Sequence, residues 1–242
     1  DDAISVNENV GTGSIDAGTI TDADTVGTYG CTLGGADAAD FACSISGSTV
    51  NIAFAADPNY ESPADADTNN VYIVTVLIDD GAADDANGAT TLTITVADLN
   101  DQAPSFTSSN AVDVAEGATA VVTLADADTD TADSGGLDYA IVTDDPAAGT
   151  QFSLSGTSLT IAAQDYETPG CGAGADSLTC TVIVSATDDA GAATQQTITV
   201  TITDTNDQTP VYQAADADDA ISVNENVGTG SIDAGTITDA DT

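Results

Sequence analysis

The stretch Thr91-Leu-Thr-Ile-Thr-Val-Ala-Asp-Leu-Asn-Asp-Gln-Ala-Pro104 joins an alternating apolar run to a short acidic string that ends in proline. The same arrangement returns 106 residues later in Thr197-Ile-Thr-Val-Thr-Ile-Thr-Asp-Thr-Asn-Asp-Gln-Thr-Pro210. The alternation predicts half-buried β-strands, and the proline marks the point where each strand has ended. Each acidic string places two carboxylates and an amide within four residues, which favours a hard-cation site at a joint between two domains.

Further period-two runs rich in β-branched residues occupy 71–78 and 180–186, and no stretch shows convincing helical periodicity. The sequence therefore predicts an all-β chain of tandem Greek-key β-sandwiches of about seven strands each, joined end to end. The expected domains are 1–104, 105–210 and 211–242, the last holding the first strands of a third repeat. Predicted strands lie at 3–6, 13–20, 28–33, 41–45, 49–54, 71–79 and 90–97, and at 111–114, 119–125, 137–142, 151–154, 158–162, 178–186 and 195–203.

A longer period overlies the first one. Residues 218–242 repeat residues 1–25 letter for letter, at an offset of 217 residues. The simplest interpretation is a tandem array whose repeating unit is a pair of divergent domains, and the alternative is an artificial overlap. Two strands cannot bury a core alone, so we expect missing sequence or a neighbouring copy to complete the third domain.

The chain has 242 residues, 41 acidic residues and no Lys, Arg or His, so no side-chain salt bridge can form. Such charge predicts disorder in polar sequences, but 41% of the residues are hydrophobic and they alternate. Like charges at about 4 Å repel by roughly 1 kcal/mol even in water, so metal cations are expected to neutralise them, with a cationic partner or high salt as the alternatives. Nucleic acid is excluded as a partner for want of basic residues, and no run is long enough to insert into a membrane.

The four cysteines form two close pairs, Cys31 with Cys43 and Cys171 with Cys180. Without histidine or a C-x-x-C motif, zinc is disfavoured. Two local disulfides, Cys31–Cys43 and Cys171–Cys180, are the preferred interpretation and indicate an extracellular or cell-surface location. Reduced, buried thiols are the alternative.

Glutamate is confined to two series of positions. One series, Glu8, Glu116 and Glu225, follows the first strand of each repeat, and the other, Glu61 and Glu167, follows a tyrosine before the sixth strand. All other acids are aspartate. Because randomly placed acids would scatter both types, this restriction indicates selection for a defined ligand geometry.

The chain resembles a pair of cadherin repeats along its whole length. The linkers resemble that family's Asp-x-Asn-Asp-Asn-x-Pro motif, with Gln102 and Gln208 in place of the last Asn. Asp165-Tyr-Glu167 resembles the family's Asp-x-Glu motif, and the Asp-Ala-Asp triplets at 22–24, 126–128 and 239–241 resemble its Asp-x-Asp motif in strand B. The resemblance implies several Ca²⁺ ions per joint, and we expect a surface or filament protein of microbial origin.

Carried over residue by residue, the resemblance implies three groups of ligands. The first joint would use Glu8, Glu61, Asp98, Asn100 and Asp101 with Asp126, Asp128 and Asp188 of the next domain. The second joint would use Glu116, Asp165, Glu167, Asp204, Asn206 and Asp207 with Asp239 and Asp241. Asp22, Asp24 and Asp80 would serve a preceding joint, and Glu225 a following one.

Two further expectations depend on aligning the repeats. Asn59 stands where the motif has Asp, so the outer ion of the first joint is expected to be the weakest or missing. If Tyr29 aligns with Tyr139 and Phe41 with Phe152, then Cys31 falls at Ile141 and Cys43 at Leu154, positions that point into the sandwich.

The chain is not expected to be an enzyme, because it lacks His, Lys and Arg for acid–base or oxyanion roles. The acids could still supply a carboxylate pair of glycosidase type, but no sequence feature marks a sugar cleft. The expected function is a calcium-rigidified fibre, filament or stalk whose partners are copies of itself, end to end or as one long chain. Two alternatives are a calcium-dependent adhesion module that binds a protein or carbohydrate, and salt adaptation of an ordinary domain.

Overall fold

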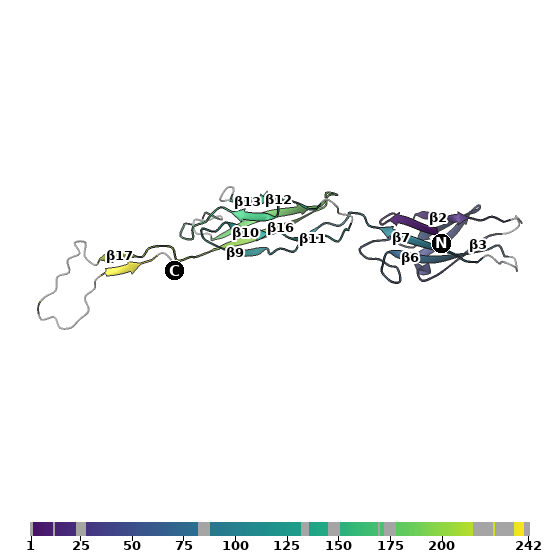
Figure 1. Ribbon diagram of the computed structural model, residues 1–242, viewed down its shortest axis with the longest axis horizontal. Helices are drawn as coiled ribbons and strands as arrows, with labels where there is room; N and C mark the ends of the chain where they lie inside the picture. Colours follow the sequence, from purple (N-terminus) through teal and green to yellow (C-terminus); the bar gives the residue numbers. More distant parts are fainter. Residues whose placement is uncertain are drawn as a thin grey trace. The chain divides into compact units, whose positions relative to one another are not determined.

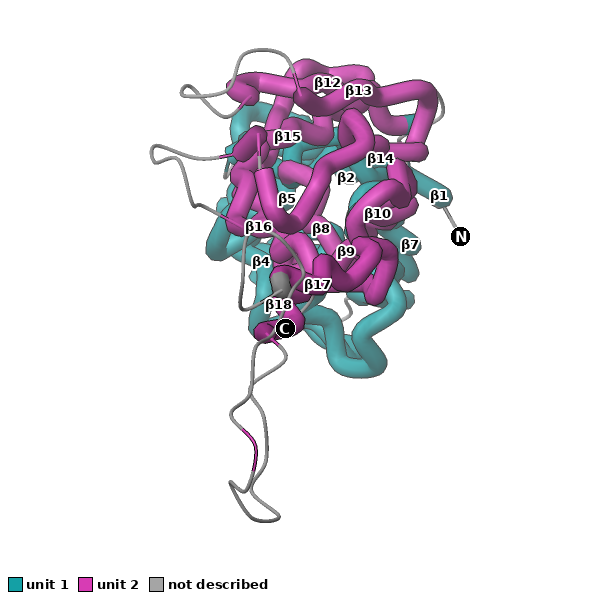
Figure 2. The backbone as a smooth tube through the Cα atoms, turned by 90° about the vertical axis from the view of Figure 1, so that its left-hand side faces the viewer, with its two compact units in different colours: residues 1–102, 128–136 teal, residues 103–127, 137–242 magenta. Residues whose placement is uncertain are grey.

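The computed structural model describes residues 2–11, 13–22, 28–81, 88–131, 136–144, 151–168, 170–171, 178–214, 225 and 235–239. The described chain divides into two compact units, shown in different colours in Figure 2. Unit 1 comprises 1–102 with 128–136, and unit 2 comprises 103–127 with 137–242. Residues 128–136 thus belong to unit 1, although unit 2 contains the sequence on both sides of them.

The prediction of an all-β fold is confirmed, since the described residues form strands and a single 3-10 turn (Figure 1). Unit 1 contains β1 (Asp2–Asn7), β2 (Ser14–Thr19), β3 (Gly30–Gly34), η1 (Ala38–Asp40), β4 (Phe41–Ser46), β5 (Thr49–Phe54), β6 (Val71–Asp79) and β7 (Thr90–Ala97). They form a four-stranded sheet in the order β1-β7-β6-β3 and a three-stranded sheet in the order β2-β5-β4. The predicted strands of this region match the observed ones to within two residues.

The core of unit 1 lies between these two sheets and makes the unit a β-sandwich. Ile52 from one sheet and Val74, Leu92 and Ile94 from the other are fully buried. The rings of Phe41, Phe54 and Tyr72 pack together, with centroids 4.5–5.5 Å apart. Alternating strand residues supply this core, because successive side chains of a strand point to opposite faces.

Unit 2 repeats the arrangement with β9 (Ala111–Ala115), β10 (Ala120–Thr123), β12 (Asp138–Thr143), β13 (Phe152–Ser155), β14 (Ser158–Ile161), β15 (Thr179–Thr187) and β16 (Ala193–Thr203). The sheet orders are β12-β15-β16-β9 and β10-β14-β13. β8 (Ser105–Phe106) and β11 (Asp126–Ala127), which pair with each other, were not predicted from the sequence. A strand of two residues is too short to show the alternation of apolar and polar residues from which the other strands were predicted.

In both units, the first long strand pairs in parallel with the last one. β1 lies parallel to β7 and β9 lies parallel to β16, so the first long strand of each unit runs beside the strand that leads into the linker. Glu8 and Glu116, which follow β1 and β9, are thereby brought next to the linkers that begin at Asp98 and Asp204.

Both predicted disulfides, Cys31–Cys43 and Cys171–Cys180, are present. The alignment used to place the first one was wrong by two residues. Counted back from the two linkers, Thr90 corresponds to Gln196, so their strand partners Val76 and Val184 correspond to each other as well. Two residues further along these strands, Ile78 corresponds to Ala186. Because Cys31 pairs with Ile78 and Tyr139 pairs with Ala186, Cys31 corresponds to Tyr139. By the same reasoning Cys43, opposite Ile52, corresponds to Phe152, opposite Ile161. The first disulfide therefore takes the positions of two aromatic residues of unit 2.

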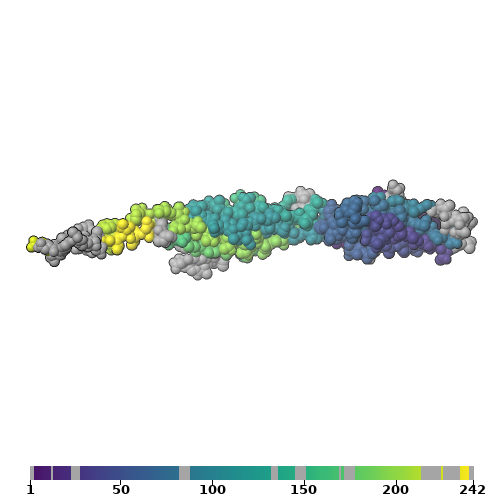
Figure 3. Space-filling model, turned by 90° about the horizontal axis from the view of Figure 1, so that it is seen from below, coloured from purple at the N-terminus to yellow at the C-terminus, as the bar shows by residue number. Residues whose placement is uncertain are grey.

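The C-terminal region contains β17 (Val211–Ala214) and β18 (Gly235–Thr238), which pair antiparallel and lie side by side in Figure 3. β18 is a copy of residues 18–21, which extend beyond the end of β2. The residues that repeat the sequence of β2 are 231–236, so β18 is shifted by two to four residues relative to the position that the repeat predicts. β2 pairs with β5 in unit 1, whereas the repeated sequence in this region pairs with β17 instead. Residues 219–224, the copy of β1, fall outside the described residues.

We predict that Gly35→Ala destabilises unit 1 more than Gly47→Ala does. Both glycines have positive φ, +97° and +63°, where any side chain is strained by about 1–2 kcal/mol. A Cβ at Gly35 would also lie 2.6 Å from the carbonyl oxygen of Ile73, whereas a Cβ at Gly47 meets nothing within 4 Å. Urea unfolding of the two variants should differ by more than about 1 kcal/mol, and equal losses would contradict the close approach.

Candidate metal centre

The carboxylate of Glu8 is the centre of the candidate site in unit 1. Its side chain is fully buried, at 0% exposure. Oε1 accepts a hydrogen bond from the Leu99 amide and Oε2 one from the Tyr60 amide, both at 2.8 Å. One carboxylate thus ties together the end of the first strand, the loop that carries Glu61 and the linker. Without basic residues in the chain, backbone N–H groups replace a salt bridge here.

The loop that carries Glu61 is held by buried aspartates. Asp37 accepts hydrogen bonds from the amides of Ala66 (2.8 Å) and Ile73 (2.6 Å). Asp65 accepts from the amides of Asn69 and Asn70. Burial opposes the ionisation of Asp65, but these donors and a hydrogen bond with the Asp67 side chain together outweigh burial and hold its pKa below the ordinary value. Hydrogen bonds within unit 1 therefore hold this loop in place without a bound ion.

Two carboxylate clusters share Glu61. Glu8, Glu61 and Asp98 offer oxygens within 4.8 Å of one another, and so do Glu61, Asp101 and Asp130. Both oxygens of Glu61 and one of Asp130 are buried without a hydrogen-bond partner. Burial raises the pKa of Glu61 from 4.5 to about 7, with the neighbouring Glu8 and Asp130 carboxylates adding to the effect. A binding site for a multiply charged cation requires such buried oxygens without a hydrogen-bond partner, because the cation itself becomes their partner.

Asp130 is a candidate ligand that sequence analysis missed. It is 5% exposed, and its second oxygen accepts the Gln102 amide at 2.7 Å. Residues 126–130 contain two overlapping Asp-x-Asp triplets, and the prediction selected the first one. In the second triplet, Asp128 accepts the Asp130 amide at 3.1 Å and has its other oxygen buried without a partner. The overlap itself was the signal that could have identified Asp130.

The linker of unit 1 is held by the same segment. The Thr131 amide donates to Asp98 at 2.6 Å, and the Thr131 hydroxyl also donates to it. Asp101 accepts from the amides of the Asn9 and Gln102 side chains. Asn100 has a buried side-chain oxygen without a partner. The structure thus brings the predicted residues Glu8, Glu61, Asp98 and Asp101 together with the unpredicted Asp130 in unit 1. Asn100 and Asp128 lie within two residues of these ligands along the chain.

Two residues predicted for the first joint, Asp126 and Asp188, lie in unit 2. Asp126 accepts a hydrogen bond from the Tyr139 hydroxyl, and burial together with this bond raises the pKa of Tyr139 to about 12. Asp188 is 6% exposed; one oxygen accepts the Ala192 amide at 2.9 Å, and the other is buried without a partner. Asp188 therefore has an orphaned oxygen, whereas Asp126 is engaged by tyrosine.

Unit 2 rebuilds the glutamate bridge. Glu116 Oε1 accepts the Thr205 amide at 2.7 Å and Oε2 accepts the Tyr166 amide at 2.9 Å, the same roles that Glu8 fills. Glu116, Asp165 and Glu167 form a third carboxylate cluster, and Asp204 has a buried oxygen without a partner. Asn206 and Asp207 are exposed, and Asp207 accepts from the side chain of Gln208.

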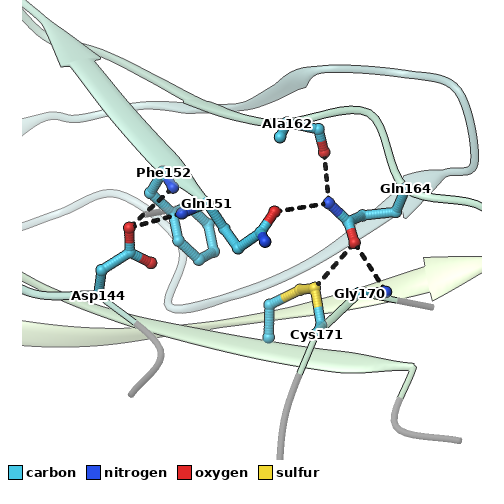
Figure 4. Close-up of a disulfide and its surroundings, with 8 residues drawn as sticks. Asp144, Gln151, Phe152, Ala162, Gln164, Gly170 and Cys171 are labelled. Atoms are coloured by element: carbon cyan, nitrogen blue, oxygen red, sulfur yellow. Dashed lines mark hydrogen bonds between the residues drawn. A yellow bond between two sulfur atoms is a disulfide. The ribbon is translucent and has the colours of Figure 1, made fainter. Parts of the chain in front are cut away.

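A buried amide positions the loop of this second cluster (Figure 4). Gln164 donates to the Ala162 carbonyl at 2.7 Å and to the Gln151 side chain at 3.0 Å, and accepts from the Gly170 amide at 3.2 Å. The sulfur of Cys171 lies 3.4 Å from the same oxygen, a contact rather than a hydrogen bond because a disulfide sulfur carries no hydrogen. The disulfide and Gln164 together fix the chain on both sides of Asp165–Glu167.

The remaining predicted ligands are more scattered. Asp22 accepts from the Tyr29 hydroxyl at 3.2 Å, and Asp80 is close enough to help raise the pKa of that tyrosine, after burial and the bond to Asp22. The three carboxylate clusters found among the described residues do not include Asp239 or Glu225. Asp24 and Asp241 fall outside the described residues.

The oxygen-only donor set fits Ca²⁺, which takes six to eight oxygens in irregular geometry. Glu61, Asp98, Asn100, Asp101, Asp128 and Asp130, together with Glu8, would hold it in unit 1. When bound, the ion would supply the positive charge that the chain lacks. Soft or borderline metals are disfavoured, since the site offers neither nitrogen nor free sulfur.

Comparison with solved structures shows a cadherin-domain fold. The chain is 20% identical to a structure of protocadherin gamma B7 extracellular cadherin domains 1–4, with a TM-score of 0.69, covering 100% of this chain and 58% of that one. A protocadherin gammaB7 EC3-6 cis-dimer is 21% identical at a TM-score of 0.65, covering 98% and 63%. Human protocadherin-24 EC1-2 is 19% identical at a TM-score of 0.61, covering 84% and 94%.

These likenesses establish the fold. The chain spans about three fifths of the first two structures. No family model matches the sequence, and no curated protein does. Among the described residues, no helix is long and apolar enough to cross a membrane. The similar structures are protocadherins, one of them human, so the expectation of a microbial source has no support.

We predict that Glu61 makes the calcium-free protein more stable in mild acid. Because its folded pKa is raised to about 7, the stabilisation by protonated Glu61 is complete below about pH 4.5 and is lost as the pH rises through about 7. In chelator, the melting temperature should rise on going from about pH 8 to about pH 5.5. The rise should be smaller in Glu61→Gln than in the wild type or in the exposed control Glu225→Gln. Equal slopes in all three proteins would exclude this role.

Proposed function

We propose that this chain is a segment of an extracellular, calcium-rigidified tandem-repeat fibre, filament or stalk without catalytic activity. The supporting observation is the convergence of three distant segments in unit 1, at Glu61, at 98–102 and at 128–131. Their carboxylates meet with orphaned oxygens and without any cationic side chain. Bound calcium would convert mutual repulsion into attraction between these segments.

The physical consequence is a linker whose stiffness depends on calcium. Without the ion, carboxylates within 4.8 Å of one another repel, so the electrostatic energy falls when the segments that carry them move apart. With the ion, the linker and residues 128–131 share one set of ligands. Extracellular calcium modules bind at about 10⁻⁴–10⁻³ M, which suits a compartment where calcium is always abundant.

The recurrence of 25 residues supports repetition of this joint. The sequence that begins unit 1 begins again after the second linker, and the second linker is preceded by its own glutamate bridge at Glu116. We infer that paired repeats follow one another, either in one long chain or through copies placed end to end.

Calcium-dependent adhesion is a second candidate, favoured by apolar side chains on one face of a sheet. Ile73 and Leu77 of β6 are 47% and 41% exposed. Such a pair can form the centre of a contact with a protein or carbohydrate partner. Calcium-dependent clustering of beads coated with the chain, abolished by Ile73→Ser with Leu77→Ser, would favour adhesion over a purely structural role.

We predict that calcium narrows the distribution of overall dimensions measured by small-angle scattering and raises the melting temperature, and that chelator reverses both effects. Asp130→Asn should weaken calcium binding at least about tenfold, because it removes one charge from a cluster of three carboxylates. Asp113→Asn makes the same change on an exposed position of β9 and should have no effect. Dimensions and melting temperature that do not respond to calcium would refute the proposal.

A further inference from the structure

Each unit has a short ligand loop that ends in a glutamate of the proposed metal site, 57–61 in unit 1 and 163–167 in unit 2. One backbone contact is common to both loops. The Asn9 amide donates to the Pro58 carbonyl at 3.0 Å, and the Gly117 amide donates to the Gln164 carbonyl at 2.9 Å. In each unit the donor is the residue after the bridging glutamate, so Pro58 and Gln164 occupy corresponding positions.

These two residues restrain the loop differently. Pro58 is buried, and its own ring fixes the backbone φ at about −65°. Gln164 is also buried, at 7% exposure, but its backbone has no such constraint, so its position depends on what the side chain contacts. Its side-chain oxygen accepts from the Gly170 amide at 3.2 Å and lies 3.4 Å from the sulfur of Cys171 (Figure 4). The residue that positions the ligand loop of unit 2 is therefore in contact with the disulfide.

The disulfide also ties the segment after the ligand loop to a core strand. Cys180 and Tyr72 are each the second residue of the strand that follows the loop, β15 in unit 2 and β6 in unit 1, and they are 0% and 1% exposed. The Tyr72 hydroxyl accepts from the Ala64 amide at 3.3 Å, whereas Cys180 is bonded to Cys171. Residues at the same place in the strand thus make this connection with a hydrogen bond in unit 1 and with a covalent bond in unit 2.

Unit 1 holds its ligand loop without sulfur. The buried aspartates described above accept four backbone amides of this region, and the Asn70 side chain donates to the Tyr60 carbonyl at 2.9 Å. The Cys31–Cys43 disulfide joins β3 to β4, whereas the ligand loop lies further along the chain, between β5 and β6. The two units therefore differ in what holds a ligand loop of the same design in place.

We propose that the Cys171–Cys180 disulfide, acting through Gln164, sets the calcium affinity of the carboxylate cluster of unit 2, and that the calcium affinity of unit 1 does not depend on a disulfide. The proposal rests on the calcium sites proposed above and names what regulates one of them. Gln164 is a positioning residue, because it directly precedes Asp165 and supplies no oxygen to the cluster.

The physical reason is the repulsion within the cluster. The carboxylates of Glu116, Asp165 and Glu167 have oxygens within 4.8 Å of one another and repel when no ion is bound. A tethered loop keeps them together for calcium. When the loop is free to move away, only a fraction of the molecules can bind the ion directly, and the apparent affinity falls by that fraction.

A dithiol reductant would release this tether. Its two S–H groups give two electrons and two protons to the disulfide, so Cys171 and Cys180 become thiols and the reductant closes a disulfide of its own. Because coupling between two equilibria is reciprocal, bound calcium should oppose this reduction by the same factor by which reduction weakens calcium binding. A reductant would thus loosen the calcium site of unit 2 and leave those of unit 1 unchanged.

The test uses the full chain and removes one disulfide at a time. Cys171→Ala with Cys180→Ala is the test variant, and Cys31→Ala with Cys43→Ala is the matched control, since the two bonds have similar sequence separations of 9 and 12 residues. NMR follows the calcium titration at the backbone amides that donate to the bridging glutamates, which are those of Tyr60 and Leu99 in unit 1 and those of Tyr166 and Thr205 in unit 2.

The test variant should bind calcium at least about tenfold more weakly in unit 2, with the affinity of unit 1 unchanged. The control should keep both affinities. In chelator, the Tyr166 amide should exchange its hydrogen faster in the test variant than in the wild type, a result that needs no calcium. In the wild type, calcium should raise the dithiol concentration that reduces Cys171–Cys180 and leave the concentration that reduces Cys31–Cys43 unchanged.

Gln164→Leu separates positioning from general loss of stability and keeps the disulfide. It should weaken calcium binding in unit 2 to a similar extent by itself. Combined with the loss of Cys171–Cys180 it should add little, because both changes break the same contact, whereas independent effects would add.

Unchanged calcium affinity of unit 2 in the test variant, or full additivity with Gln164→Leu, would overturn the proposal. If the test variant does not fold, an unchanged affinity of Gln164→Leu overturns it instead. An oxidised wild type that binds no calcium would refute the proposed function itself. An oxidised wild type that binds calcium with an affinity independent of the disulfide would refute this inference alone.

Discussion

The hydrogen bonds of the glutamate after the first long strand of each unit, which is buried in unit 1 and half-buried in unit 2, are the interactions on which the rest of the site depends. Glu8 and Glu116 each accept two backbone N–H groups, one from the loop before the sixth strand and one from the linker. A carboxylate taken out of water without such donors would be costly. These bonds explain why the parallel pairs β1–β7 and β9–β16 matter: they deliver the glutamate to the linker.

The acidic side chains of the site differ in whether their oxygens already accept hydrogen bonds. Because no basic residue exists, backbone amides satisfy the structural carboxylates, such as Glu8, Asp37 and Asp65. Glu61 and Asp130, whose side chains keep buried oxygens without a partner, belong to one carboxylate cluster. The division between satisfied and orphaned oxygens separates the acids that hold the fold from those proposed to bind a cation, and composition alone cannot make this distinction.

The sequence predicted the long strands well because one face of each is buried, and burial imposes a period of two. It also singled out Glu8 and Glu61 through the rarity of glutamate and its matching positions; the structure places both in one carboxylate cluster, and their role as ligands stays a prediction. It missed β8 and β11, which contain two residues each, and Asp130, because two overlapping triplets offered the same pattern. The position of Cys31 was misjudged because strand register is set by ladder partners, which short apolar strings do not reveal. The domain boundaries and the ligand sets remain predictions.

The parallel pairing of β1 with β7 has a mechanical consequence. Six consecutive residue pairs join Asp2–Asn7 to Leu92–Ala97, and the chain enters and leaves unit 1 through these two strands. A pull on the two ends therefore slides one strand along the other and loads all of these bonds together, because the strands run in the same direction. An antiparallel pair pulled from adjacent ends would unzip one bond at a time. Each sandwich therefore resists tension applied along its parallel pair of strands, β1 with β7 in unit 1 and β9 with β16 in unit 2.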